Sequence, residues 1–487
     1  MKALPRWGLL LLGITSVGAL LRFPTLGVQS LWFDESFTIL QLRQPLGDFL
    51  AGMDLYQSTP PLYYFVAWPW ERVVGDSAIG MRSLSAIFGT VTVPVVFLAG
   101  RALFSTKAGL LAATLVATSP TLVWYSQEAR PYALLILLTS ASLLFLAREL
   151  QEHRRRDVAL FAVTSALAIA THYFAAFLVV PAAVVILWRR RDGLALGSLA
   201  LIVVAGLAVL PLALAQRARG GGSYIAGTPV AERLSEVARQ FVTGQTLAPG
   251  QGLGLLAGVM VVFGLFLLVV RTRGAERRTG ILLLALAGFA VGVPAAMGLA
   301  GENFLLLRNV LSGWVPLALV AAAGFAARRA GRLGLSAGVI LAVLYAAITV
   351  GVAVTPSFQR SDWRGIARAM NAQPASRAIV VQPGWSAPAI SIYLPGSYSP
   401  GARVPVRVSE VWVLGPEAPA PGVAKSARTL VSRLKLGRGS VRLGRAEKVR
   451  DLKLMVLILD PPRLLTGQQI HRAGLTPEPG TPFFDPR

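Results

Sequence analysis

Residues 194–215 read LALGSLALIVVAGLAVLPLALA, an apolar run without a single charged side chain. About twenty such residues cross the hydrocarbon core of a bilayer, so this run predicts a membrane-spanning helix. Over the whole chain of 487 residues, 54% are hydrophobic and only 14% are charged, and the mean hydropathy is +0.60. This composition excludes an ordinary soluble protein and predicts a polytopic α-helical membrane protein.

Ten further apolar runs have a comparable length, which gives about eleven predicted transmembrane helices. The runs fall at roughly 8–26, 80–101, 108–125, 132–148, 158–173, 174–188, 194–215, 252–270, 280–299, 308–327 and 333–353. We interpret the first as an uncleaved membrane helix, because it lacks the small-residue cleavage site of a secretory signal. The boundary between the fifth and sixth runs, at Thr171-His172-Tyr173, is the weakest of the set.

The net charge of +24 comes mainly from arginines grouped in short clusters between the apolar runs. Alternate connections collect these clusters on one side, as the positive-inside rule requires of the cytoplasmic side. The clusters are Lys2/Arg6, Arg101/Lys107, Arg148 with Arg154–Arg156, Arg189–Arg191, Arg271–Arg278 and Arg328–Arg332. No basic stretch is interleaved with aromatic residues, so nucleic-acid binding is not expected. The chain has no cysteine, which excludes disulfides and thiolate chemistry.

This topology predicts a membrane domain over residues 1–353, with a long outside loop at 27–79. In that loop, Pro60-Pro61 permits a helix to begin. The aromatic run 62–70 that follows is too short for a span, so we expect a helix lying in the membrane interface. A twelfth span is the alternative.

The composition changes after residue 353 and predicts a small extracytoplasmic α/β domain over 354–487. A helix is expected after Ser361, and strands are expected around 377–382, 410–414 and 454–460. Helices between strands indicate a partly parallel sheet. The residues after about 466, rich in proline and glycine, are expected to form a flexible tail.

Ionisable side chains gather on the predicted outer side. Asp34 and Glu35 are adjacent carboxylates among aromatics just after the first apolar run. Charges at a membrane edge are costly to desolvate and often mark a site, the alternative being a helix cap. Further such residues are Glu128 and Arg130 in the link 127–131, His172, and Arg308 at the start of the tenth run. Their convergence favours a functional site.

Four stretches of this sequence carry a family resemblance. They are LWFDES at 31–36, TPPLYY at 59–64, YSQEARPY at 125–132, and RNVL at 308–311 with Pro316. In order and spacing, over roughly residues 1–330, they resemble the bacterial GT-C membrane glycosyltransferases related to protein O-mannosyltransferases and aminoarabinose transferases (families 39 and 83). The resemblance implies a GT-C fold and a polyprenyl-phosphate-linked sugar donor. It also implies a hydroxyl acceptor and transfer at the outer face of the bacterial cytoplasmic membrane.

The resemblance also implies roles for individual residues. Asp34 matches the family's catalytic acid of the first loop and is expected to be the general base, while Glu35 either orients it or takes its place. Contacts to donor or acceptor are expected from Glu128, Arg130, His172, Arg308, Tyr63 and Tyr64. In-line attack at the anomeric carbon implies inversion. One departure is Thr59, since some relatives carry Lys or His immediately before the Pro-Pro-Leu-Tyr element.

Two other functions remain as alternatives at this stage. A transporter or flippase of lipid-linked sugars would be expected to show internal repeats and charges at mid-membrane, and neither is found. A glycan ligase or polymerase using a polyprenyl diphosphate donor would share the topology. No metal site is expected from the sequence, although a divalent cation shared by Asp34 and Glu128 is left open. The sequence specifies neither the sugar nor the acceptor.

Overall fold

The computed structural model describes residues 5–219, 227–244, 251–371, 376–382, 386–394, 404–415, 441–449, 452–472 and 483–485. The chain forms two compact units. The membrane unit comprises Met1–Gly27 and Gln41–Phe358, and the C-terminal unit comprises Val28–Leu40 and Gln359–Arg487. The segment Val28–Leu40, which carries Asp34 and Glu35, therefore groups with the C-terminal unit and not with the helices that flank it in sequence.

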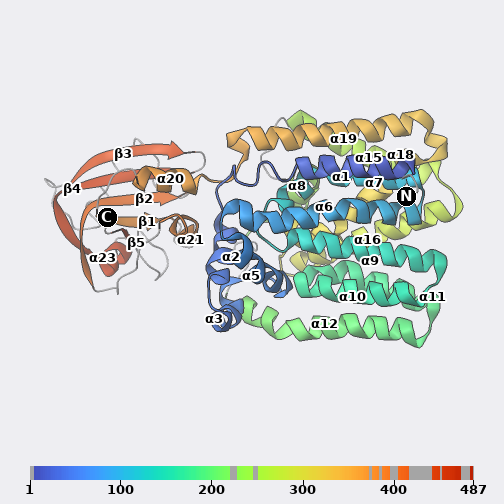
Figure 1. Ribbon diagram of the computed structural model, residues 1–487, viewed down its shortest axis with the longest axis horizontal. Coiled ribbons are helices and arrows are strands. Elements are labelled where there is room, and N and C mark those ends of the chain that lie inside the picture. The colour runs from blue at the N-terminus through green and yellow to red at the C-terminus, as the bar shows by residue number, and fades with distance from the viewer. Residues whose placement is uncertain are drawn as a thin grey trace. The chain divides into compact units, whose positions relative to one another are not determined.

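Long helices dominate the membrane unit and lie side by side, roughly parallel to one another (Figure 1). The helices of this bundle, which include the short α8, are α1 (Arg6–Leu20), α6 (Ala78–Leu103), α7 (Thr106–Thr118), α8 (Pro120–Ser126), α9 (Tyr132–Glu152), α10 (Arg155–Thr171), α11 (Ala176–Arg190), α12 (Gly193–Ala218), α15 (Gln251–Arg271), α16 (Gly274–Leu299), α18 (Trp314–Ala326) and α19 (Gly331–Val354). Short 3-10 turns, η1 (Tyr173–Ala175), η2 (Leu311–Gly313) and η3 (Arg328–Ala330), and the four-residue α17 (Leu307–Val310) precede three of them.

Each of the eleven predicted runs overlaps helix in the structure, although the first helix ends at Leu20 and not at residue 26, so the polytopic helical fold is confirmed. Among the described residues, eight helices are long and apolar enough to cross a membrane, and the bent pair α7–α8 makes a ninth. The helices α1 and α10 are shorter, with 15 and 17 residues. The uncertain boundary between the fifth and sixth runs is a true break, because α10 ends at Thr171 and a 3-10 turn begins at Tyr173.

The third predicted span, 108–125, is not one straight helix. It breaks into α7 and α8, which meet at a bend of 57°. Pro120 has no N–H, so the carbonyl of Val116 loses the helical bond it would otherwise receive. Ser119 starts the second helix, since its hydroxyl oxygen accepts a bond from the Leu122 N–H at 3.2 Å. The bend redirects the chain toward the link that carries Glu128.

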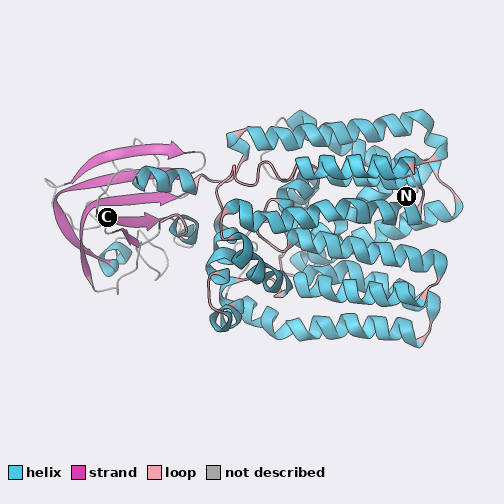
Figure 2. Cartoon of the chain, viewed as in Figure 1, coloured by secondary structure: helices cyan, strands magenta, loops and turns pink. Residues whose placement is uncertain are grey.

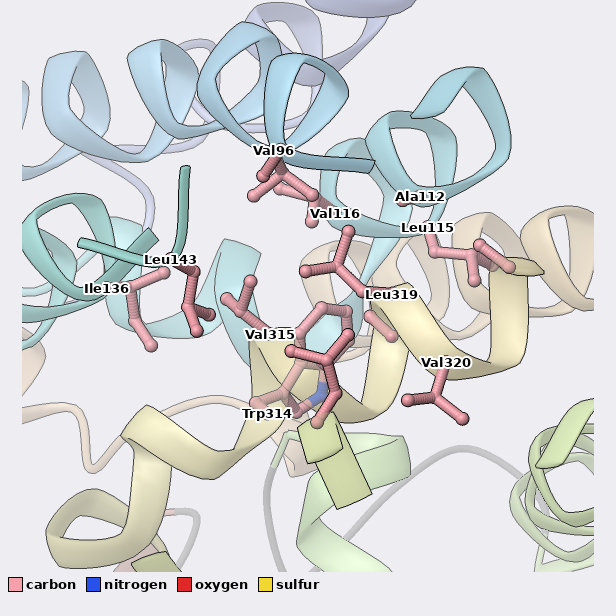
Figure 3. Close-up of a cluster of buried hydrophobic side chains, with 14 of the residues drawn as sticks. Val96, Ala112, Leu115, Val116, Ile136, Leu143, Trp314, Val315, Leu319 and Val320 are labelled. Carbon is pink, nitrogen blue, oxygen red and sulfur yellow. The ribbon is translucent and has the colours of Figure 1, made fainter. Parts of the chain in front are cut away.

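The core of the membrane unit is an apolar cluster contributed by helices far apart in sequence. Side chains of α6, α7, α9 and α18 converge there, and Trp314 lies among them (Figure 3). The contact between α15 and α18 depends on glycine, because a Cβ at Gly324 would collide with the carbonyl oxygen of Gly264. Such close backbone approach through small residues is typical of membrane helices, where apolar burial gains little against lipid.

Shorter helices occupy the predicted long loop and the connection 216–250. The loop contains α2 (Phe33–Leu42), α3 (Leu46–Ala51), α4 (Met53–Tyr56) and α5 (Leu62–Val74). As predicted, α5 begins directly after Pro60-Pro61. The helix α14 (Val230–Thr243) was not predicted, because its sequence is polar and amphipathic. It packs against the bend, where the Thr121 hydroxyl donates to the carbonyl of Gln240 at 2.8 Å.

The C-terminal unit is built on a five-stranded sheet of order β3-β4-β2-β1-β5. The strands are β1 (Arg377–Val381), β2 (Pro405–Gly415), β3 (Val441–Val449), β4 (Leu452–Thr466) and β5 (Phe483–Asp485). Among the described residues, strands occur only in this unit (Figure 2). Only β1 and β2 are parallel, so the sheet is mixed and the expectation of a partly parallel sheet is confirmed.

Alternate strand residues separate two apolar clusters on the two faces of this sheet. Ala378 and Val380 belong to one cluster, and Ile379 and Val381 belong to the other, as the two-residue repeat of a strand requires. The helices α20 (Trp363–Asn371) and α21 (Pro388–Ser391) contribute to the second cluster. The sequence reading missed β3 and β5. The stretch expected to be a tail contains α23 (Gly467–Arg472) and β5, which pairs with β1.

Candidate functional site

The link between α8 and α9 is buried, not an exposed turn. Glu128 and Arg130 are 1% and 3% exposed, and the Arg130 N–H donates to the Glu128 carbonyl at 2.8 Å. The Arg130 guanidinium donates through Nη1 to Oε1 of Gln57 at 2.7 Å. Buried charges are costly unless they are paired or used, which makes this link a candidate for ligand binding.

The Thr59–Tyr64 stretch lies next to this link. Tyr63 and Tyr64 are fully buried, and their rings meet edge to face at 5.5 Å. The Tyr64 hydroxyl lies 2.9 Å from the Thr59 hydroxyl. Ser85 connects the two parts of the site, since its hydroxyl is 3.5 Å from the Tyr63 hydroxyl and donates to the Arg130 carbonyl at 3.4 Å.

His172 occupies the turn between α10 and η1 and is 2% exposed. Its ring lies 6.0 Å from the ring of Tyr132, the residue that begins α9. Burial, and then the positive charges of Arg308 and Arg130, lower the pKa of His172 to about 3. The imidazole is therefore neutral near pH 7, and it can contact a ligand as a hydrogen-bonding group but not as a cation.

Nε2 of Gln57 and Nδ1 of His172 are buried polar atoms that have no hydrogen-bond partner among the described residues. Since arginine can only donate, the bond from Arg130 fixes Oε1 of Gln57 toward it and leaves the amide donors facing elsewhere. Leaving a buried donor unpaired costs about 1–3 kcal/mol, so such atoms indicate that a polar ligand or water completes the site.

The predicted residues of the membrane unit therefore come together. Arg130 contacts the Thr59–Tyr64 neighbourhood through Gln57 and Ser85, and both Arg130 and Arg308 act electrostatically on His172. Sequence reasoning missed Gln57, which no motif marks. In the part of the chain that the structure describes, no group of three or more His, Cys, Asp or Glu side chains could hold a metal ion.

Asp34 and Glu35 lie in the first turn of α2, within the C-terminal unit. Glu35 is fully buried, and its Oε2 accepts a bond from the Trp32 N–H at 3.2 Å. This is the reciprocal bond of a capping box, in which the third helical residue returns to the N-cap. The Arg360 guanidinium lies 3.8 Å from the same carboxylate oxygen. The capping alternative thus applies to Glu35, and the neighbouring Asp34 is half-buried.

Arg22 is a buried arginine of the membrane unit that sequence reasoning missed. Its side chain is fully buried and donates four hydrogen bonds, to Ser126 Oγ at 3.1 Å, to the Gly18 and Ala117 carbonyls at 2.9 Å and to the Val116 carbonyl at 3.0 Å. The last bond replaces the donor that Pro120 lacks. A cavity of about 10 Å³, room for about one water, lies beside Arg22.

Gln127 reinforces this connection from the other side. Its amide nitrogen donates to the Arg22 carbonyl at 2.9 Å and to the Thr25 hydroxyl at 2.7 Å. Arg22 and Gln127 therefore fix both sides of the α7–α8 bend to the segment after α1, and this bend positions Glu128. The only sequence signal for Arg22 is a single charge at the end of an apolar run.

The fold is similar to those of solved membrane glycosyltransferases. Over 93% of this chain and 98% of the other, it matches the crystal structure of ArnT from Cupriavidus metallidurans bound to undecaprenyl phosphate, with a TM-score of 0.56 and 13% identity. The oligosaccharyltransferase AglB from Archaeoglobus fulgidus, in complex with an inhibitory peptide and a dolichol-phosphate, gives a TM-score of 0.44 at 12% identity. The match covers 75% of this chain and 58% of AglB. The arabinofuranosyltransferase AftD from Mycobacteria gives a TM-score of 0.46 at 20% identity, and the match covers 79% of this chain and 30% of AftD.

A membrane bundle with buried arginines and a carboxylate at its helix links, together with a small sheet unit, defines the class of GT-C-fold membrane proteins. Residues 58–214 of this chain match the family described as dolichyl-phosphate-mannose-protein mannosyltransferase, and the fold as a whole is similar to that of ArnT. The chain is a multi-pass membrane protein. A search of curated proteins gave no match.

Proposed function

We propose that this protein transfers a sugar from a polyprenyl-phosphate donor to a hydroxyl acceptor, with inversion at the anomeric carbon. The observation that carries the proposal is the buried group around Arg130 in the membrane unit, with Arg308 and His172 within electrostatic reach. A lipid-phosphate donor needs cations that hold the departing phosphate at the lipid boundary. ArnT, whose fold is similar over nearly its whole length, was crystallised with undecaprenyl phosphate.

Arg130 and Arg308 bind the donor phosphate in this proposal. A guanidinium is always charged and presents a planar fork that matches two phosphate oxygens. They supply the positive charge that a lysine or histidine before Pro-Pro-Leu-Tyr supplies in some relatives, a position taken here by Thr59. Neutral His172 and the amide of Gln57 add hydrogen bonds to donor oxygens. Negative charge that develops on the phosphate as it leaves is stabilised by these fixed groups.

Asp34 is the general base. Its carboxylate takes the proton of the acceptor hydroxyl while that oxygen attacks the anomeric carbon, and the bond from that carbon to the phosphate oxygen breaks. Glu35 is committed to the capping bond with Trp32 and to Arg360, so it positions the first turn of α2 and does not take the proton. Neighbouring helical residues do not share a face, which allows the two carboxylates to differ in role.

Glu128 orients the acceptor or the sugar through hydrogen bonds, and Tyr63 and Tyr64 pack against the same site. The reaction takes place at the outer face of the bacterial cytoplasmic membrane. This side is inferred from the arginine clusters, which the positive-inside rule assigns to the cytoplasm. Successive connections between membrane helices lie on alternate sides of the membrane, and this alternation assigns Glu128, His172 and Arg308 to the side opposite the arginine clusters.

The test uses purified full-length protein in lipid nanodiscs with labelled polyprenyl-phosphate sugars and a panel of hydroxyl acceptors. We expect new glycosidic bonds of inverted configuration, and about 10²- to 10⁴-fold slower transfer by Asp34→Asn. Asp76→Asn, which breaks an exposed ion pair with Arg43 in the same loop, is the matched control and should retain activity.

Three results would contradict the proposal. In sealed vesicles, movement of the donor across the bilayer without a new glycosidic bond would identify a flippase. Transfer only from polyprenyl diphosphate donors would identify a ligase or polymerase. Wild-type transfer rates in a folded Asp34→Asn variant would remove Asp34 as the base.

A further inference from the structure

The backbone just before Asp34 is fastened to residues that follow the last membrane helix. The Leu31 N–H donates to the Tyr393 hydroxyl at 2.7 Å, and the Ser30 hydroxyl donates to Asp362 at 2.9 Å. The Arg364 N–H donates to the Ser30 hydroxyl at 3.2 Å. These bonds join positions more than 300 residues apart in sequence, all of them within the C-terminal unit.

Arg360 makes the corresponding contacts to the start of α2. Its guanidinium lies 3.8 Å from Glu35 Oε2 and 5.8 Å from the centre of the Trp32 ring, and its N–H donates to Gln29 at 3.0 Å. Arg360 and Glu35 are 7% and 0% exposed. A buried carboxylate whose cationic partner is removed is strongly destabilised, so the loss of Arg360 weakens the hold on Glu35 and on its capping bond.

We propose that the C-terminal unit positions the catalytic base, with Arg360 and Tyr393 as positioning residues that act through Glu35 and Leu31 on Asp34. This inference rests on the proposed role of Asp34. The soluble unit is then part of the catalytic apparatus and not an appendage. Neither Arg360 nor Tyr393 reacts with substrate. Their effect is to fix the first turn of α2, because Glu35 and Leu31 flank the residue that takes the proton.

The physical basis is the sensitivity of proton transfer to placement. A reacting group displaced by about 1 Å can lose about 100-fold in rate. Without Arg360, the Glu35 carboxylate turns toward water and releases the Trp32 N–H, and the first turn of α2 frays with Asp34 in it. Without the Tyr393 hydroxyl, the backbone at Leu31 loses one anchor while the charge pair remains, so a smaller effect is expected.

The experiment measures kcat and KM for both substrates in full-length Arg360→Met, Arg360→Lys and Tyr393→Phe. We expect kcat to fall about 10- to 100-fold in Arg360→Met and less in the other two. KM for the polyprenyl-phosphate donor should stay within about 2-fold, because donor binding is unaffected. The matched control is Arg377→Met, which removes a buried arginine of the same unit paired with Glu410 at 3.0 Å.

A rescue variant distinguishes positioning from general damage. Glutamine also serves as the third residue of a capping box, so Glu35→Gln combined with Arg360→Met should restore the Trp32 bond without a buried charge. We expect this double variant to recover most of the kcat lost in Arg360→Met. A double variant as inactive as Asp34→Asn would show that Glu35 is itself catalytic, and it would overturn the inference.

Hydrogen exchange of residues 28–40 supplies a readout independent of catalysis. We expect faster exchange there in Arg360→Met and Tyr393→Phe, and unchanged exchange in Arg377→Met. This inference is refuted, and the proposed function left intact, if Arg360→Met and Tyr393→Phe both keep the wild-type exchange rates and kcat while Asp34→Asn is inactive. An active Asp34→Asn would instead refute the proposed function, whatever the exchange rates.

Discussion

Arg22→Met should test whether the helix break before Glu128 depends on a distant arginine. The wild-type guanidinium donates to three backbone carbonyls, Gly18, Ala117 and Val116, and to the hydroxyl of Ser126. Methionine fills a similar volume but donates nothing. The Val116 carbonyl cannot turn to its usual helical partner, because that partner is the nitrogen of Pro120.

The expected loss follows from these acceptors. A buried acceptor left without a donor costs about 1–3 kcal/mol, so three carbonyls give about 3–9 kcal/mol as an upper range. Removing the guanidinium also removes the cost of burying a charge that has no carboxylate partner among the described residues, a gain of several kcal/mol. Water entering the neighbouring cavity can satisfy one of the carbonyls. We expect the free energy of unfolding to fall by about 2–4 kcal/mol.

The assay is reversible unfolding of the purified protein in mixed micelles, followed by tryptophan fluorescence, with hydrogen exchange of residues 116–127. Arg43→Met is the control, since the exposed pair of Arg43 with Asp76 is expected to contribute no more than about 1 kcal/mol. The reasoning is refuted if Arg22→Met unfolds within about 0.5 kcal/mol of the wild type, or if exchange increases everywhere except at the bend.

Three further outcomes are expected. Gly324→Ala should lower the free energy of unfolding by about 1–3 kcal/mol, because the added Cβ would collide with the Gly264 backbone. Gly288→Ala is the control and should leave the free energy of unfolding unchanged, because there is open space around Gly288. Since the pKa of His172 falls from 6.5 to about 3 on folding, the wild type should lose stability as pH drops from 6.5 toward 3, and His172→Asn should lose less over that range. Gln57→Met should raise KM for the donor about 10-fold, because it removes the Oε1 acceptor of Arg130 Nη1 and the unpaired amide donors of Gln57, and an unchanged KM would exclude Gln57 from donor binding.

The membrane helices could be predicted because their signal is local and strong. An apolar run of spanning length has few alternatives, and all eleven runs overlap helix. The signals that failed were weaker. The edge strand β3 reads VRLGRAEKV, with charges that hide its two-residue repeat, and β5 has only three residues. The bend at Pro120 was visible as Ser119-Pro120, but the apolar length of the run concealed it.

The site was predictable only where charges stand out against apolar sequence. Glu128, Arg130, His172 and Arg308 do so, and the structure brings their neighbourhoods together. Gln57 and Arg360 do not, because neither the type of residue nor the neighbouring sequence distinguishes them from ordinary polar residues of a loop. Their roles come from contacts across 73 and more than 300 residues of sequence, which no periodicity records.

Both proposed functional carboxylates depend on an arginine that is remote in sequence. Arg22 supports the bend that leads to Glu128, and Arg360 supports the helix start that contains Asp34. A guanidinium suits both positions, since its five donors can serve several acceptors at once while its charge is permanent. Lysine offers a single compact ammonium, which cannot reach the acceptors of Arg22 on three separate chain segments. A conservative exchange to lysine should therefore be costly at Arg22, whose four acceptors need several donors at once.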